Sequence, residues 1–482
     1  MLILITISVV IFSLAPLLVL GGASIGSSVV LAFIIVPAIA AVIVRWPIVG
    51  FYVVSACTVL IEQAPLFTPI GTDRLNIFSW PPALEGLIER PIGFLIIFIF
   101  LVFVCHYLVT RQHSLRGGEL LPPFLLFLLC VAGGILHGLL SGGNFKMIVV
   151  EVRPFWYLFL AYLLAYNFIT SKNHIRILFW IVILSAGVKS IQGVYIFIVV
   201  EHGNIDSKHA IMSHEESFFF VALLLLLVLF CLHYRYRPQF YTALLVLPFL
   251  LIALVANQRR ADYIALVVGI LVAWAFVFCV KPQIRKSLVI GMLVSIVLIV
   301  GYVTAFSHTS GILAEPASEV VSVFSPDSSD TVSADSNAYR VIENNDLKYT
   351  ALQNPLFGWG FGKEFLQPIL LPDISALDPN YLYVPHNTIY WVWMRLGAIG
   401  FFSLWYLFGA IIVRGGLIIR QLKDQYLQLV AIYIIGVTFM EIIVAIADYQ
   451  LFFYRNVLYL GLLGGVLMKL PALDEKKEVK PL

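Results

Sequence analysis

Apolar segments long enough to cross a lipid bilayer recur along most of the chain, and one long polar block, from about 307 to 386, interrupts them. A run of about 18 or more apolar residues predicts a transmembrane helix, because a helix of that length spans the hydrocarbon core. We therefore expect about fourteen spans, the first three joined by very short connections. Their predicted ranges are 2–20, 24–44, 46–62, 92–110, 121–140, 152–169, 175–200, 216–233, 239–256, 260–280, 287–306, 388–413, 425–446 and 450–470.

The composition indicates an all-α polytopic membrane protein, since 61% of the 482 residues are hydrophobic and 12% are charged. The net charge of +3 is small and dispersed, whereas nucleic-acid binding needs a clustered basic face, so we expect no nucleic-acid partner. The five cysteines lie in or beside apolar runs without CxxC spacing, which is typical of packing residues. Residues 1–20 lack a basic n-region and a convincing cleavage site, so we expect a retained first span.

Basic residues concentrate in alternate connections between the predicted spans. The positive-inside rule predicts that these connections and both termini are cytoplasmic. The residues concerned are Arg45, Arg111, Arg116, Lys172, Arg176, Arg235, Arg237, Lys281, Arg285, Lys286, Arg414, Arg420, Lys423, Lys476, Lys477 and Lys480. The other connections are then predicted to meet on the external side, which is periplasmic in an organism with two membranes: about 62–91, 141–152, 201–215, 257–260 and 307–386.

Four regions follow from this pattern. We expect an N-terminal transmembrane bundle of about eleven helices, a large external loop between the eleventh and twelfth spans, C-terminal transmembrane helices and a cytoplasmic tail. Their boundaries are 1–306, 307–387, 388–470 and 471–482.

The large external loop has two parts with different patterns. It holds ten acidic and three basic residues, and its Ser/Asp-rich part, 318–336, predicts a mobile segment. From Ser336, apolar residues at helical spacing predict a short amphipathic helix on the membrane surface that stops at Asn354-Pro355. The glycines that follow, Gly358, Gly360 and Gly362, are suited to tight backbone turns.

Charged residues at the outer ends of three spans predict a cationic rim. The segments are 151–154 at the start of the sixth span, 257–262 between the ninth and tenth, and His386-Asn387 before the twelfth. Arginine forks bind phosphate, and histidine can take a proton from a hydroxyl near neutral pH. The alternatives are that the arginines are snorkelling anchors, that His386 is a surface residue and that Asn387 caps the twelfth helix.

Other ionisable residues lie within the predicted spans. Lys189, Arg395 and Glu441 must find partners or water, so we expect structural pairing first and a polar acceptor channel second. We expect Asp448 and Arg455 to act similarly. The run His214-Glu215-Glu216 could suggest a metal site, but its adjacent residues do not share a helical face, so we interpret it as a solvated loop end. The chain has no glycine-rich nucleotide loop and no cytoplasmic DxD pair, which argues against a nucleotide-sugar donor.

Motifs between about 255 and 405 resemble the bacterial O-antigen ligase and O-antigen polymerase superfamily. They are carried by 258–266, which reads QRRADYIAL, by 354–362, which reads NPLFGWGFG, and by 385–390, which reads PHNTIY, followed by LGAIG at 396–400. The rest of the chain is similar to the family only in topology. The order of these motifs and the large late loop carry the resemblance.

The resemblance implies a metal-independent glycosyltransferase with a GT-C-like bundle, no cofactor and an undecaprenyl-pyrophosphate-linked glycan as donor. By that resemblance, His386 and Arg260 are the expected catalytic residues, and Arg153 corresponds by its place at the outer end of a mid-chain span. Arg259 stands where the family often has serine, so either arginine of the pair could contact phosphate. We also expect Arg340 and Asn387 to contribute to substrate binding.

The sequence leaves several functional alternatives open. An inverting transferase on the external face of the bacterial cytoplasmic membrane is the first, with a lipid A core, a growing polysaccharide or a protein hydroxyl as acceptor. A polymerase is slightly preferred over a ligase. The second class is a polysaccharide or lipid-linked oligosaccharide translocase, which would need a path through the bilayer, lined for example by Lys189, Arg395 and Glu441, and two-fold internal symmetry.

Overall fold

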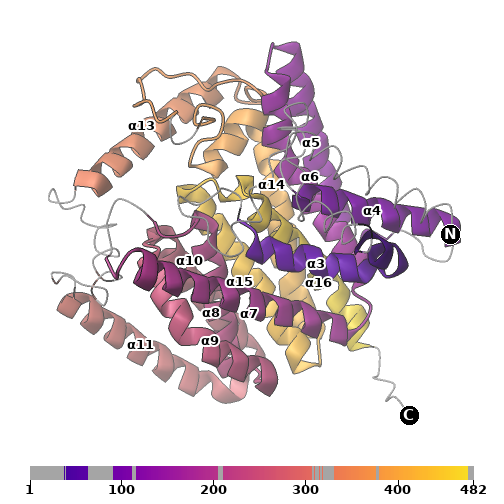
Figure 1. Cartoon of the computed structure of the whole chain (residues 1–482), viewed down its shortest axis with the longest axis vertical. Helices are drawn as coiled ribbons and strands as arrows, with labels where there is room; N and C mark the ends of the chain where they lie inside the picture. Colours follow the sequence, from indigo (N-terminus) through magenta and orange to yellow (C-terminus); the bar gives the residue numbers. More distant parts are fainter. Residues whose placement is uncertain are drawn as a thin grey trace, which may run out of the picture.

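The described part of the chain is helical, as predicted. The computed structural model describes residues 39–62, 91–110, 116–204, 210–306, 331–375 and 379–475, with isolated residues between them (Figure 1). Eleven helices in these ranges are long and apolar enough to cross a membrane, and a shorter apolar helix is Pro47–Leu60. The predicted class, an all-α polytopic membrane protein, is confirmed. Span 2–20, most of 24–44, the segment 318–330 and the tail from 476 lie outside the described residues.

Each predicted span from 46–62 onward corresponds to a helix. The helices are α3 (Pro47–Leu60), α4 (Pro91–Thr110), α5 (Leu121–Leu140), α6 (Phe145–Phe168), α7 (Lys172–Tyr195), α8 (His214–Leu232), α9 (Arg237–Ala256), α10 (Arg260–Val280), α11 (Arg285–Phe306), α13 (Thr331–Gln353), α14 (Thr388–Gln421), α15 (Gln425–Ala447) and α16 (Tyr454–Asp474). Three short turns complete the element order: η2 (Ile196–Val200), η3 (Pro282–Ile284) and η4 (Gln450–Phe452).

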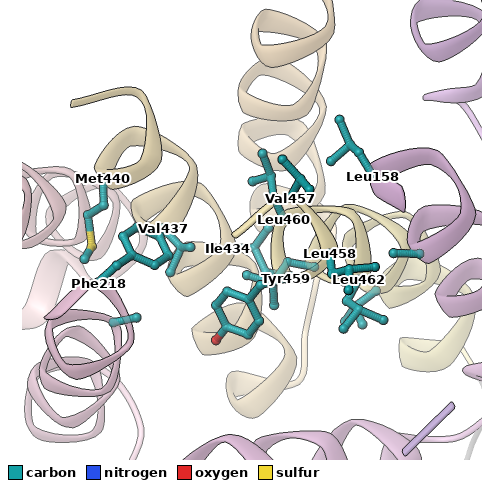
Figure 2. Packing of buried hydrophobic residues seen from close by; sticks show 14 of the residues in the cluster. Leu158, Phe218, Ile434, Val437, Met440, Val457, Leu458, Tyr459, Leu460 and Leu462 are labelled. Carbon is teal, nitrogen blue, oxygen red and sulfur yellow. The ribbon is translucent and has the colours of Figure 1, made fainter. Parts of the chain in front are cut away.

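The core lies around α15 and α16. Figure 2 shows side chains of α6, α8, α15 and α16 gathered in one apolar cluster. Helices α6 and α16 approach closely, since a Cβ atom at Gly461 would lie 2.3 Å from the carbonyl oxygen of Leu158. Helix α11 instead exposes apolar side chains along most of its length, which is typical of a helix that faces lipid.

The connections meet at two opposite ends of the bundle. At one end, the amide of Asn257 holds the main chain of Met212 and Ser213. At the other, Lys172 pairs with Asp424, and Asp474 accepts from the main-chain N–H of Asp424 at 2.9 Å. We call the first the loop end, made of 141–144, 201–204, 210–213, 257–259, 354–375, 379–387 and 448–453, and the second the basic end, made of 116–120, 169–171, 233–236, 281–284 and 422–424.

The predicted loop helix is confirmed as α13, although it begins at Thr331, five residues before the expected start. It ends at Gln353, directly before Asn354-Pro355, as the sequence predicts. It packs against α14 at the loop end (Figure 1).

Glycines after α13 insert the chain into a break in α14. Gly397 interrupts that helix with φ 64° and ψ −170°. The freed main-chain groups bond to the inserted segment: Trp359 donates to Met394 at 2.6 Å, and Ala398 donates to Pro355 at 2.8 Å. Gly358, Gly360 and Gly362 all have φ near +80°, which L side chains rarely adopt, so the expectation of glycine turns is confirmed.

A buried ion pair holds this insertion. The guanidinium of Arg395 lies 2.5 Å from Glu151, with both side chains fully buried. Arg395 also donates to the carbonyl of Tyr383 at 2.9 Å, and Glu151 accepts from the N–H of Gly362 at 2.5 Å. The predicted start of the sixth span at 152 is wrong, because Asn144 caps α6 by accepting from Met147 N and so begins the helix at Phe145.

A second buried network joins α3, α7, α8 and α16. Lys189 lies 2.6 Å from Glu62, and Arg455 lies 2.7 Å from Glu216 and 3.4 Å from Glu215. The prediction of a solvated loop end at 214–216 is wrong. The three residues begin α8, and Arg455 from the far end of the sequence supplies the charge that lets both glutamates be buried.

Glu441 completes the set of intramembrane charges named from the sequence. It accepts from the amide of Asn456 at 3.0 Å and is buried. The expected structural pairing of Lys189, Arg395 and Arg455 is thus confirmed, and Glu441 has a neutral polar partner.

Candidate active site

Charged side chains from five segments converge at the loop end. Asp448, which follows α15, is within electrostatic reach of His214, Arg259 and His386. Arg259 is in turn within reach of Arg340 from α13. Two of the expected arginines and the expected histidine, widely separated in sequence, therefore share one site.

His386 is held by a carboxylate that the sequence analysis did not identify. Its Nδ1 lies 3.1 Å from Oε1 of Glu343, and its main-chain N–H donates to Oε2 at 3.1 Å. The imidazole packs edge-on against Tyr339 and Tyr449, at ring-centroid distances of 5.7 and 5.5 Å. Its side chain is 24% exposed while that of Glu343 is 1% exposed, so the ring connects a buried acid to an accessible surface.

The Glu343 interaction defines the chemistry available to His386. A carboxylate at Nδ1 favours the tautomer that carries its proton there, which leaves Nε2 as the acceptor. Within the described residues, Nε2 makes no hydrogen bond. The ring can therefore accept a proton from a hydroxyl group.

Arg259 lies at the N-cap position of α10, after Gln258, whose φ is 51°. Its Nε is buried and makes no hydrogen bond within the part of the chain that the structure describes. Burial lowers the pKa of its guanidinium, and the nearby Asp448 and Asp262 act in the opposite direction. Because arginine titrates far above neutrality, the group remains a cation that can bind an anionic ligand.

Asp448 neutralises part of this charge. Its carboxylate lies 2.8 Å from Nδ1 of His214, and it accepts from the N–H of Tyr449 at 2.9 Å and from Gln450 Nε2 at 3.2 Å. Burial raises its pKa, but His214, Arg259 and His386 outweigh burial and hold that pKa below its ordinary value. Asp448 is therefore an anion beside two histidines and an arginine.

The remaining predicted residues have different surroundings. Arg260 is the first residue of α10 and is half-buried, whereas Arg153 is buried inside α6, well past its start. Asn387 caps α14, since its Oδ1 accepts from Tyr390 N at 3.0 Å, which confirms the alternative interpretation as a cap.

Two residues of the cluster had no functional prediction. Glu343 could have been found from its spacing, because Tyr339, Glu343 and Asp346 recur at helical intervals and so share one face of α13. His214 gave no such signal, because its partner Asp448 is 234 positions away in the sequence.

The site can bind an anion and move a proton. Arg259 and Arg340 supply positive charge, and the His386–Glu343 pair supplies a base. Among the described residues, no group of three His, Cys, Asp or Glu side chains is arranged to hold a metal ion.

The fold and this site define a polytopic helical membrane protein with an arginine- and histidine-lined site at one end of its bundle. Residues 243–405 match the family model described as O-Antigen ligase. This match confirms the resemblance to the O-antigen ligase/polymerase superfamily and implies glycan substrates. It covers about a third of the chain, including Arg259, Arg340, Glu343 and His386. No curated protein matches the chain.

Proposed function

We propose that the protein is a membrane glycosyltransferase of the GT-C type that moves a glycan from undecaprenyl pyrophosphate to a hydroxyl group on the external face of the bacterial cytoplasmic membrane. The observation that carries this proposal is the convergence of Arg259, Arg340 and His386 at one end of the bundle. It joins the two groups that such a reaction needs, a cationic site for pyrophosphate and a base for the acceptor.

The arginines act on the leaving group. As the bond between the anomeric carbon and the phosphate oxygen breaks, negative charge grows on the pyrophosphate. Arg259 and Arg340 can offset that charge, and Arg259 is half-buried, so partial shielding from water strengthens its interaction. In this mechanism the chain's own arginines stabilise the negative charge of the leaving group.

His386 acts on the acceptor. Its Nε2 takes the proton of the attacking hydroxyl while Glu343 stabilises the imidazolium that forms at Nδ1. The acceptor oxygen forms its bond to the anomeric carbon on the face opposite the leaving pyrophosphate, so the configuration is inverted.

The distribution of charge supports the external location. Lys172, Arg176, Arg235, Lys281 and Lys423 lie at or beside the basic end, and the positive-inside rule makes that end cytoplasmic. The loop end, with the site, then faces outward.

The environment of the intramembrane charges supports an enzyme over a translocase. A polar path would need Lys189, Arg395 and Glu441 to line water. In the structure each is buried, and each is joined to protein groups: Lys189 to Glu62, Arg395 to Glu151 and Glu441 to Asn456. These side chains therefore hold helices together.

Transfer activity in proteoliposomes tests the proposal. His386→Ala should abolish transfer from an undecaprenyl-pyrophosphate-linked glycan, and Arg259→Ala should lower it by about a hundredfold to a thousandfold, while both variants stay inserted and folded. Lys286→Ala, an exposed cation on α11 next to the basic end, is the control and should leave activity unchanged. Near-normal activity in both site variants would reject the assignment.

The acceptor is addressed by deleting the gene and analysing the glycans. A polymerase, the preferred alternative, predicts loss of long chains with single repeats still attached. A ligase predicts long polymer that accumulates on its lipid carrier.

A further inference from the structure

A second imidazole–carboxylate pair lies beside the proposed site. His214 Nδ1 is 2.8 Å from Asp448, and the ring of Tyr449 lies near both histidines, with centroids 6.1 Å from His214 and 5.5 Å from His386. The side chain of His214 is 29% exposed. The acceptor chemistry proposed for His386 does not use this pair.

The backbone fixes His214 relative to Arg259. Asn257 accepts from the N–H of Met212 at 2.9 Å and donates to the carbonyl of Ser213 at 3.2 Å and to Ser217 at 2.8 Å. Asn257 is fully buried and precedes Arg259 by two residues. One buried amide thus joins the start of α8 to the turn before α10, and it places the imidazole and the guanidinium on the same rim.

We propose that His214 is a donor-binding residue, whose Nε2–H holds a phosphate oxygen of the lipid-linked pyrophosphate together with Arg259, while Asp448 keeps its Nδ1–H in place. This inference rests on the proposed function, because it deepens the description of the same pyrophosphate site. It separates the two histidines by role: His386 serves the acceptor and His214 the donor.

The charges around His214 couple donor binding to the uptake of a proton by its imidazole. The residues that face His214 are Arg259, Asp448, Glu215 and Tyr449, and Glu215 is itself paired with Arg455. Without ligand, Arg259 disfavours a second positive charge beside it. A bound pyrophosphate diester adds two negative charges, which favour the protonated imidazole, so binding takes up a proton onto His214.

The consequence is a donor affinity that depends on pH. A suitable probe is a short-chain prenyl diphosphoryl N-acetylglucosamine, because a pyrophosphate diester stays fully ionised near neutrality. Binding to the full-length protein in nanodiscs should tighten as the pH falls from about 8 to about 6, through the range where imidazole gains its proton. His214→Gln should weaken binding at about pH 6 by roughly tenfold to a hundredfold and remove the pH dependence, since a charge-assisted hydrogen bond is lost.

Two comparisons separate this inference from the proposed function. His386→Ala should keep the affinity for the probe and its pH dependence. Asp448→Asn should reduce that dependence, because the amide can still accept from Nδ1–H but no longer supplies the negative charge that stabilises the imidazolium. In turnover assays, His214→Gln should raise the KM for the donor more than it lowers kcat. An unchanged melting temperature in the glutamine variant shows that a binding defect is not a folding defect.

The outcomes are distinct. Failure of the wild-type protein to bind the probe, or binding that survives Arg259→Ala unchanged, would overturn the proposed function itself. Binding that depends on Arg259 but keeps its affinity and pH profile in His214→Gln would overturn only the role of His214.

Discussion

Glu343 on α13 accepts both the main-chain N–H and the ring Nδ1 of His386, each at 3.1 Å. The large loop is therefore a structural part of the site, because its helix supplies the carboxylate that orients the imidazole. Fixing the ring through two bonds selects one tautomer and one direction for Nε2.

Glu343→Gln tests this arrangement. The amide can still accept one hydrogen bond but cannot stabilise an imidazolium, so we expect kcat for glycan transfer to fall by about tenfold to a hundredfold with little change in donor KM. Steady-state kinetics in proteoliposomes measures both constants. Glu119→Gln is the matched control, since Glu119 is exposed and pairs with Arg414 at the basic end. An unchanged kcat in the Glu343 variant would contradict the role of this carboxylate.

Arg259→Ala and Arg260→Ala distinguish the two adjacent arginines. The charge of Arg259 reaches Arg340 and Asp448, so its loss should lower transfer by about a hundredfold to a thousandfold, as for the loss of one preorganised transition-state donor. Arg260→Ala should have a smaller effect. The reverse order of activities would assign the phosphate contact to Arg260.

Gly397→Ala should prevent the segment after α13 from packing into the break in α14. An added Cβ would lie 2.3 Å from the carbonyl oxygen of Leu356, and φ is +64°. Overpacking and backbone strain together predict a loss of about 2–4 kcal/mol or failure to fold, measured as thermal unfolding in detergent. The control is Gly409→Ala in the same helix, which has no atom within 4 Å of its added Cβ and should be neutral or stabilising. Equal melting temperatures for both variants would contradict the break at Gly397.

Arg395→Met should cost about 3–5 kcal/mol, because it leaves the buried carboxylate of Glu151 without its cation. Adding Glu151→Gln should recover part of that loss. The double variant should therefore lose less unfolding free energy than the two single variants lose together. Melting temperatures of the four proteins give the comparison. Simple additivity would show that the pair does not act as a unit.

Asp448→Asn should reduce the loss of thermal stability that the protein shows at acidic pH. The pKa of Asp448 is held below its ordinary value in the folded protein, so its charge stabilises the fold above about pH 3.9 and this contribution is lost as the pH falls further. The asparagine variant should therefore melt at a lower temperature than wild type at neutral pH, and the difference should shrink below about pH 4. Parallel melting curves over that range would contradict the assignment.

Hydropathy predicted the spans well because burial in lipid is a local, additive property of consecutive residues. Every predicted span from 46–62 onward has a helix, and α13 ends at the predicted Asn354-Pro355. The boundary error at the start of α6, predicted at 152 and found at Phe145, came from polar residues in a transmembrane helix. Glu151 and Arg153 looked like a helix end, yet Glu151 is buried against Arg395, 244 positions later.

The site was only partly predictable, because its side chains too are placed by partners far away in the sequence. The sequence singled out Arg259 and His386 as members of one outer rim and Arg340 as a substrate-binding residue, and the structure brings the three together. It also suggested Arg260, Arg153 and Asn387, whose contribution to substrate binding stays a prediction. Glu343 contacts His386, 43 residues away, and His214 contacts Asp448, 234 residues away. Spacing along α13 marks the face that carries Glu343, but it does not identify the partner of either residue.

The sequence by itself determined which segments cross the membrane, in what order, and which ends of the helices carry the basic charge, since these depend on the transfer energies of neighbouring side chains. The tertiary structure decided which charges are paired. Arg455 makes Glu215 and Glu216 buried ion partners where the sequence indicated a solvated loop, because its positive charge offsets the cost of removing the two carboxylates from water.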